Sequence, residues 1–344
     1  MVSLHLKQQA GMPETSPDFV SLGLKLLGGL CLFLYGVTMM GDTLKELAAD
    51  KMKSVMRRFT KNAVSGIFTG TVATAILDSS SVVIIMVLSM VHAGIISSIE
   101  AYGVVMGANI GTTVSSQLIA LDVMEYSPIF LATGLIIMMA AKKEVAKKAG
   151  HLIFAAGLVF FGLYFMDIAV EPLKGYPPVM EWMKGLDHPI KGALMGGLLT
   201  LVIQSSSATV GIAIVLASQG LISLPAGIAI MLGAEIGTCS DTLLAVIGRS
   251  REAIRTGLFH LLFNILTVSL GLILIQPLFM LVNWISGEAS PGTKIANAHM
   301  IFNICGVLLF AWFIPQFHKL MIQLVPDKKK RSKVKSFDPE IHPT

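Results

Sequence analysis

Two runs of three serines are the residues whose types and surroundings point most directly to chemistry. Ser79–Ser81 follow Asp78, and Ser205–Ser207 follow Gln204, inside two strongly apolar stretches of the chain. A serine hydroxyl donates a hydrogen bond to an anion and offers its oxygen to a cation. An ionised carboxylate at the centre of a membrane helix costs about 2.5–3.5 kcal/mol on insertion scales, so polar groups there are usually functional. The two runs therefore predict a binding site for small ions.

A second pair of related segments adds oxygen ligands. "GANIGTT" (107–113) resembles "GAEIGTC" (233–239), and the two lie 126 residues apart, as the serine runs do. This shift places each acid opposite a neutral polar residue: Asp78 opposite Gln204, Glu235 opposite Asn109, and Asp241 opposite Ser115. Hard oxygen ligands suit small cations. We therefore expect sodium at this site.

The composition shows which elements must position these residues. The chain has 344 residues, of which 54% are hydrophobic and only 14% charged. A soluble protein carries about 25% charged residues, and several apolar runs here reach the roughly 20 residues that a membrane helix needs. The three cysteines lie within apolar runs and read as small hydrophobic residues. We therefore expect an all-α, multi-pass protein of the cell membrane, with the lipid bilayer as a partner and no nucleic acid.

The fixed shift predicts two copies of one unit. The copies span 19–141 and 145–285, and a last transmembrane helix spans 296–325. An N-terminal tail, 1–18, and a basic tail, 326–344, flank them. Each copy contains a helix, a serine segment, a glycine-rich segment and a further helix. The glycines predict that the third element is a broken helix that exposes its carbonyl groups.

The serine segments are too long for simple helices across the membrane. Segment 65–96 would be about 48 Å long as one helix, whereas the hydrocarbon core is about 30 Å thick. It either tilts strongly or folds back at the serines as a re-entrant hairpin, as would 190–222. Folding back places most lysines and arginines on one side, which the positive-inside rule assigns to the cytoplasm. Each copy then crosses three times, so the copies are inverted, with the N-terminus outside and the C-terminus cytoplasmic.

Packing offers a simpler role for several of these residues. A lone serine in a membrane helix usually bonds to its own backbone or to a neighbouring helix. Two related triplets, each beside Asp or Gln, argue against that role. "HLLFN" (260–264) and "HMIFN" (299–303) also match each other, and each places His and Asn on one helix face. These residues either line an ion path or form hydrogen bonds between helices.

Paired "[QD]SSS" and "GA[NE]IGT" motifs in inverted halves resemble the type II sodium-dependent phosphate cotransporter family, here as a compact bacterial member. The resemblance covers most of 19–315, with "QSSS" at 204–207 and Asp78 in place of glutamine in the first copy. It implies a phosphate site formed by Ser79, Ser80, Ser81, Gln204, Ser205, Ser206, Ser207, Asn109, Thr112 and Thr113. It also implies co-transported sodium ions near Asp78, Ser80, Asn109, Gln204, Ser206, Glu235, Thr238 and Asp241. The oligomeric state, including a homo-oligomer, is left open.

We therefore expect a sodium-coupled symporter of inorganic phosphate that works by alternating access. Inverted repeats with interrupted helices typically place the substrate site at their interface. The alternatives are transport of another anion or phosphate export on the same fold, and a channel, which would be built from rings of like residues. An intramembrane hydrolase would use Ser79 or Ser205 with His260 or His299. No nucleophile elbow or H-E-x-x-H pattern supports it, so no enzymatic activity is expected.

Overall fold

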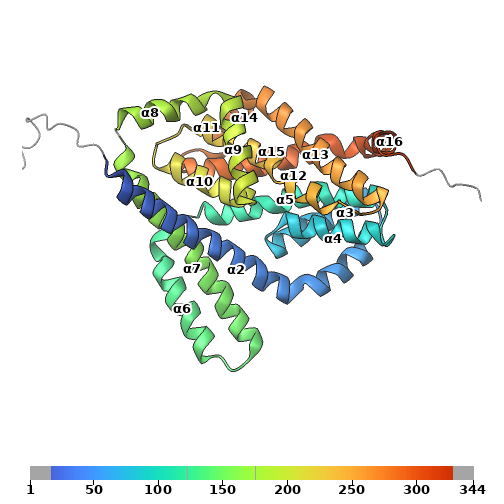
Figure 1. Ribbon diagram of the computed structural model, residues 1–344, viewed down its shortest axis with the longest axis horizontal. Coiled ribbons are helices and arrows are strands. Elements are labelled where there is room, and N and C mark those ends of the chain that lie inside the picture. The colour runs from blue at the N-terminus through green and yellow to red at the C-terminus, as the bar shows by residue number, and fades with distance from the viewer. Residues whose placement is uncertain (1–16, 122, 175, 328–344) are drawn as a thin grey trace, which may run out of the picture.

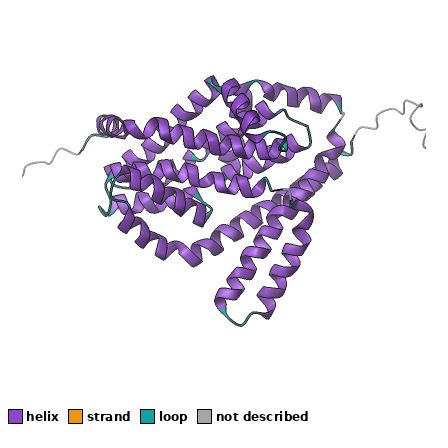
Figure 2. Cartoon of the chain, turned by 180° about the vertical axis from the view of Figure 1, so that it is seen from behind, coloured by secondary structure: helices purple, strands orange, loops and turns teal. Residues whose placement is uncertain are grey.

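The computed structural model describes residues 17–121, 123–174 and 176–327, and all regular structure in these ranges is helical (Figure 2). The first half contains six α-helices: α2 (Phe19–Phe59), α3 (Ala63–Leu77), α4 (Ser80–His92), α5 (Ser98–Ile119), α6 (Ser127–Ala140) and α7 (Glu144–Val170). The second half contains α8 (Pro177–Lys184), α9 (Pro189–Ile203), α10 (Ser206–Ser218), α11 (Leu224–Gly237), α12 (Cys239–Ala245), α13 (Arg251–Ile273), α14 (Ile275–Ser286), α15 (Pro291–Phe310) and α16 (Ile314–Leu324).

The helix boundaries confirm the predicted repeat. A shift of 126 residues carries α3 onto α9 and α4 onto α10, with the same first and last positions. It carries α5 onto the combined span of α11 and α12. The agreement of boundaries as well as motifs means that the two copies share local backbone structure.

Each serine segment is interrupted at its polar residues. Asp78 and Gln204 adopt left-handed backbone, with φ of 51° and 59°, although neither is glycine. The next residue, Ser79 or Ser205, is extended and caps the following helix by accepting a hydrogen bond from the N–H of Val82 or Ala208. A left-handed residue followed by an extended one cannot continue a helix. The arms that result are roughly 20–22 Å long, which is too short to cross the membrane.

The two arms of each segment return to the same end. In the second segment, Ser223 Oγ, just after α10, donates to Asp187 Oδ1 just before α9, at 2.5 Å. In the first, Met90 and Ile95 at the end of α4 line a cavity with Arg57 of α2, which lies close before the start of α3. The prediction of two re-entrant hairpins is therefore confirmed.

The hairpins enter the molecule from opposite ends of α2. Helices α2 and α7 pack antiparallel, because Gly29 contacts Met166 whereas Gly36 contacts Val159. The base of the α3–α4 hairpin lies at the C-terminal end of α2, and the region before α9 lies near its N-terminal end, where the rings of Phe19 and Tyr176 are 5.5 Å apart. Figure 1 shows α3 and α4 at one end of the molecule and α8 at the other. This arrangement is the inverted topology.

The glycine-rich segments differ from the prediction. Helix α5 is continuous through Gly107, and α11 passes into α12 at Thr238 with helical angles, φ −60° and ψ −24°. The prediction of a broken helix is therefore wrong for α5, whereas in the second copy α11 ends at Gly237 and α12 begins at Cys239. A Cβ atom at Gly107 would lie 1.9 Å from the Ile67 carbonyl oxygen, and one at Gly233 would lie 1.8 Å from that of Ala193. The glycines allow the first arm of each hairpin to pack closely against its neighbouring helix.

A second internal repeat relates α13–α14 to α15–α16. The "HLLFN" and "HMIFN" motifs lie 39 residues apart, and the same shift carries α14 onto the position of α16. The shorter helix of each pair packs against the longer helix of the other, because α14 contacts α15 and α16 contacts α13. Helices α13 and α15 each contact both α5 and α11, so they lie between the two copies.

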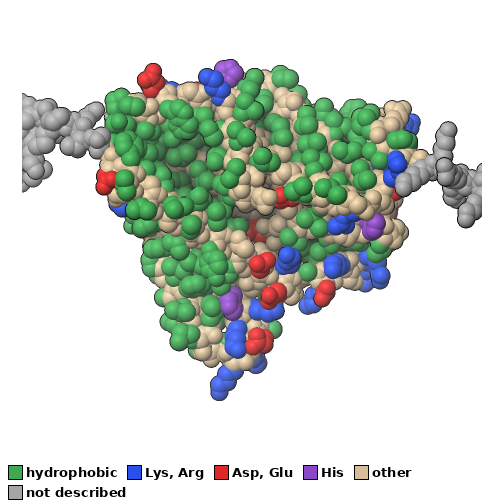
Figure 3. Space-filling model, in the orientation of Figure 1, with side chains coloured by type: hydrophobic (Ala, Val, Ile, Leu, Met, Phe, Trp, Pro, Cys, Tyr) green, Lys and Arg blue, Asp and Glu red, His purple; other side chains and the backbone are tan. Residues whose placement is uncertain are grey.

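The surface is that of a membrane protein. Five helices in the described ranges are long and apolar enough to cross a bilayer, or up to seven if two bent pairs are each counted as one crossing. Hydrophobic side chains cover much of the face in Figure 3, and lysines and arginines gather along its lower right edge. This edge corresponds to the C-terminal half of α2 and the connection between α6 and α7 in Figure 1.

Substituting Gly107 by alanine tests the close packing of α3 on α5. The added methyl group would overlap the Ile67 carbonyl oxygen, and overpacking of this kind typically costs about 1–3 kcal/mol. We expect a clear drop in melting temperature in detergent. Gly41→Ala is the matched control, because Gly41 is also helical but has no neighbouring atom within 4 Å of the built Cβ. Equal melting temperatures for the two variants would contradict the proposed role of Gly107.

Candidate functional site

The tips of the two hairpins meet in one small cavity. Its volume is about 50 Å³, and all its lining side chains are polar: Asp78, Ser79, Ser80, Ser81, Thr112, Gln204, Ser205, Ser206, Ser207 and Thr238. A water molecule needs about 10–15 Å³ of such space, so the cavity holds a few waters or a small ion. Both serine runs, which are distant in sequence, therefore contribute to the same site.

Both ends of a helix dipole are present at each tip. Helices α4 and α10 begin at Ser80 and Ser206, so their first backbone N–H groups lack partners within the helix. Helices α3 and α9 end at Leu77 and Ile203, where free carbonyl groups carry partial negative charge. The N–H groups favour an anion and the carbonyl groups favour a cation. The tips can therefore hold both kinds of ion close together.

One carboxyl group lines the cavity, a second lies behind the lining, and each accepts a hydrogen bond from a serine. Ser115 of α5 donates to Asp78 Oδ1. Ser81 of the first hairpin donates to Asp241 Oδ2 of α12 at 2.9 Å, a bond that joins the two copies. Asp78 lines the cavity, whereas Asp241 lies behind Ser81. No lysine or arginine is among the lining residues that the structure describes, so the lining offers Asp78 no basic side chain as a partner.

Besides Asp241, three of the predicted ligands lie away from the cavity lining and bond to other groups. Asn109 Nδ2 donates to Asn264 Oδ1 at 2.5 Å, and Glu235 Oε1 lies 2.6 Å from His299 Nε2. Thr113 Oγ1 donates to the Ile110 carbonyl at 2.7 Å. All three side chains are buried. Their neighbours in the motifs, Thr112 and Thr238, do line the cavity.

The two H-x-x-F-N motifs connect the copies behind the cavity. His299 of α15 lies between Glu235 and Ser116, whose Oγ is 2.7 Å from His299 Nδ1. Asn264 of α13 lies between Asn109 and the backbone of Glu235, donating to the Glu235 carbonyl at 3.0 Å. Each motif thus joins α5 of the first copy to α11 of the second. This bridging arrangement, hydrogen bonds between helices, was one of the two alternatives that the sequence left open.

Sequence reasoning did not identify Ser116 as part of this network. A signal was present, because the 126-residue shift places Ser116 opposite Thr242. Thr242 Oγ1 lies 2.9 Å from His260 Nδ1, as Ser116 Oγ lies close to His299. The two histidines therefore make equivalent contacts: His299 with the Ser116 hydroxyl of the first copy, and His260 with the Thr242 hydroxyl of the second copy.

The described residues that line the cavity include no histidine. His260 contacts Thr242, Asn264 and Cys239, and His299 contacts Ser116 and Glu235. Neither ring has a hydrogen bond to Ser79 or Ser205 among the described residues. The geometry therefore gives no support to a hydrolase that uses these serines.

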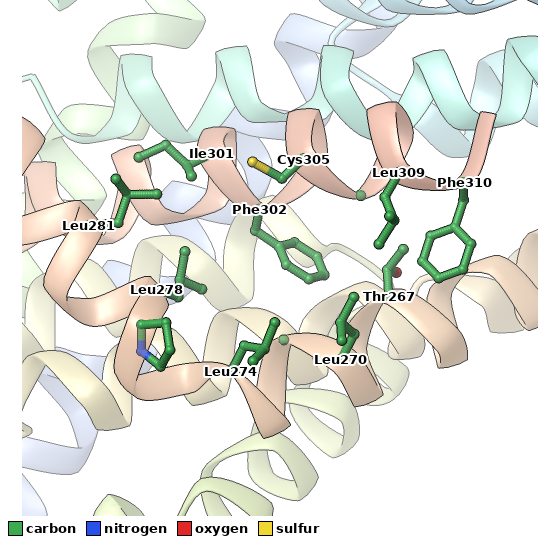
Figure 4. Close-up of a pocket in the computed structure, with 13 residues that line it drawn as sticks. Thr267, Leu270, Leu274, Leu278, Leu281, Ile301, Phe302, Cys305, Leu309 and Phe310 are labelled. Atoms are coloured by element: carbon green, nitrogen blue, oxygen red, sulfur yellow. The ribbon is translucent and has the colours of Figure 1, made fainter. Parts of the chain in front are cut away.

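Two apolar cavities lie outside the polar site. One, of about 240 Å³, adjoins it at Asp78, Ser115 and Ser207 and extends to Leu121 and Val123. The other, of about 390 Å³, lies between α13, α14 and α15 and is lined mainly by leucines and phenylalanines (Figure 4). Thr267, labelled in Figure 4, contributes a hydroxyl group to the lining of this second cavity. Neither is built to hold small ions by itself.

Comparison with known proteins agrees with this architecture. The sequence profile of the Na+/Pi-cotransporter family matches twice, over residues 32–167 and 179–314. The chain is 28% identical to "Uncharacterized protein YqeW" of Bacillus subtilis, over 87% of this chain and 97% of the relative. It is 24% identical to "Putative inorganic phosphate export protein YjbB" of Salmonella typhimurium, over 92% of this chain but only 58% of that longer protein.

A mammalian relative matches over a shorter stretch. It is "Sodium-dependent phosphate transport protein 2A" of Rattus norvegicus, 29% identical over 33% of this chain and 19% of the relative. No solved structure matches. Because the family profile covers most of the chain in two successive matches, as the repeat requires, the chain belongs to the Na+/Pi-cotransporter family.

Proposed function

We propose that the chain is a sodium-coupled carrier of inorganic phosphate whose substrate site is the cavity between the hairpin tips. One observation carries the proposal: two helix N-termini and two serine triplets, from hairpins that enter from opposite ends, line the same small polar cavity. Membership of the Na+/Pi-cotransporter family supports the choice of ions. We propose that the protein transports phosphate and catalyses no reaction.

Phosphate would be held by hydroxyl and backbone donors. Ser79–Ser81 and Ser205–Ser207 supply six hydroxyl groups, and the first N–H groups of α4 and α10 add positive ends of helix dipoles. The Gln204 amide and the Thr112 hydroxyl complete the lining. Asn109 and Thr113 lie behind it, so we assign them to positioning Thr112 rather than to direct contact.

Sodium would be held by carboxylate, hydroxyl and carbonyl oxygens. Asp78, together with Asp241 behind Ser81, supplies the charge, and Ser80, Ser206, Gln204 and Thr238 supply neutral oxygens. Glu235 bonds to His299, so we propose that it orients α11 instead of binding sodium directly. An ionised carboxylate here would repel phosphate, and bound sodium would offset that charge. Each ion then raises the affinity for the other by the same factor.

Alternating access would move each hairpin together with its packed neighbour. The contacts of Gly107 and Gly233 hold the first arm of each hairpin against α5 or α11, so these pairs are expected to move as single bodies. The basic edge of the molecule is proposed to face the cytoplasm, with the N-terminus outside. The net direction follows from the ion gradients. Efflux is a second candidate, since YjbB is named an export protein.

The proposed coupling is tested by flux in liposomes that contain the purified protein. Radioactive phosphate should enter when sodium is outside, and preloaded phosphate should leave when sodium is inside. Replacing sodium by choline should reduce both fluxes to the level of empty liposomes. Equal phosphate flux in sodium and choline would refute the coupling. An excess of sulfate that abolishes phosphate uptake would instead indicate a different oxyanion as the cargo.

Removing a hydroxyl from either tip should impair transport. We expect Ser80→Ala and Ser206→Ala each to reduce phosphate uptake at least about tenfold, because a hydrogen bond to a charged group contributes about 1.5–3 kcal/mol. Uptake is measured at equal amounts of reconstituted protein. Ser218→Ala, at the exposed far end of α10, is the matched control and should transport normally. Normal uptake by both tip variants would rule out the proposed site.

Neutralising the site carboxylates should weaken sodium dependence specifically. In Asp78→Asn and Asp241→Asn, phosphate no longer meets the full negative charge, so we expect the sodium concentration for half-maximal uptake to change at least about fivefold. A change of about 1 kcal/mol in coupling corresponds to that factor. Asp187→Asn, at the base of the second hairpin, makes the same charge change elsewhere and should leave sodium dependence intact. Identical sodium curves for all three variants would contradict the assignment.

A further inference from the structure

A groove between α2 and α4 lies outside the ion site. Lys45, Ala49 and Lys53 of α2 face Ile85 and Met86 of α4 across a cavity of about 490 Å³. A second cavity, of about 290 Å³, shares Lys53 with it and continues to Arg57. Together they have the size of a typical ligand pocket, which is about 300–1,000 Å³. We call this feature the α2–α4 groove.

The groove combines a basic rim with apolar walls. Lys45, Ala49, Lys53 and Arg57 are spaced four residues apart, so they lie on one face of α2. No Asp or Glu is among the described residues that line either cavity. Within the part of the chain that the structure describes, neither Lys53 nor Arg57 has a carboxylate within 4 Å, whereas Lys45 lies 3.9 Å from Asp42. The positive charges of Lys53 and Arg57 are therefore not paired with a carboxylate of the described residues, and that of Lys45 is only weakly paired.

The opposite wall is built for hydrocarbon. Val82, Ile85, Met86 and Met90 come from α4, and the side chain of Ile95, half exposed, closes the end near Arg57. Ser89 of α4 also lines this wall, but its hydroxyl donates to the Ile85 carbonyl and accepts from Arg249, so the remaining wall is apolar. Its apolar side chains suit an acyl chain, and the C-terminal half of α2, with its lysines and arginines, has the composition of a helix at the membrane surface. Figure 3 shows the basic residues gathered along this edge of the molecule.

We propose that the α2–α4 groove binds an anionic phospholipid, with its phosphate at Lys53 and Arg57 and an acyl chain against α4. Basic side chains attract anionic lipid at a membrane surface, and the apolar wall distinguishes a lipid from free phosphate. Because α4 is the second arm of the hairpin that carries Ser79–Ser81, an occupied groove supports that hairpin from its outer side. The proposal is independent of what the carrier transports.

Native mass spectrometry of the delipidated protein tests the proposal. Phosphatidylglycerol and phosphatidylcholine with identical acyl chains are titrated against the wild type, the double variant Lys53→Gln/Arg57→Gln, and the control Lys142→Gln/Lys143→Gln. The control removes the same charge at exposed positions between α6 and α7. We expect the groove variant to lose phosphatidylglycerol affinity by at least about tenfold, and the control to bind like the wild type.

Two further measurements separate the alternatives. Phosphatidylcholine should bind the three proteins equally, and millimolar inorganic phosphate should not displace phosphatidylglycerol. Equal phosphatidylglycerol binding by the groove and control variants would overturn the proposal. So would displacement by inorganic phosphate, which would make the groove a path for the transported anion. Melting temperatures of both variants should match, since all four substituted side chains are exposed.

Discussion

Unpaired backbone groups at the interrupted ends of apolar helices are the constraint on which the structure depends. Lipid cannot satisfy free N–H and C=O groups, so an interrupted helix is tolerated only where protein or trapped water meets it. The reversals at Asp78 and Gln204 create such ends in both copies. Bringing the two tips together lets each supply polar surroundings for the other, and the serines add further partners. The same requirement that stabilises the fold produces a polar cavity.

Close helix packing and buried hydrogen bonds keep the tips in place. Glycines at 107 and 233 allow the first arm of each hairpin to touch the backbone of its neighbour. His299 and Asn264 then connect those neighbours across the two copies, through Glu235, Ser116 and Asn109. Most of this network is buried. It gives the cavity a rigid wall of α5 and α11, against which the tips are aligned.

The repeat is symmetric in backbone and asymmetric in charge. Hairpins of identical length carry Asp78 in one copy and Gln204 in the other, and Asp241 stands opposite Ser115. The uneven carboxyl groups place the acidic side chain at the first tip and a neutral amide at the second. In the proposed carrier, this difference allows one ion to change the electrostatic environment of the other, which is one source of coupling.

The sequence by itself determined the membrane setting, the two copies, the inverted hairpins and the serines at their tips. These follow from apolar length, the 126-residue shift and the distribution of basic residues, which are properties of the chain alone. Tertiary structure decided what the remaining motif residues do. The glycines were expected to break a helix, but their space is filled by the backbone of another segment, which local sequence does not reveal. Likewise, whether Glu235, Asn109 and the two histidines face the cavity or one another depends on how α5, α11, α13 and α15 rotate on packing. Those rotations are set by contacts between different helices, such as that of Glu235 with His299.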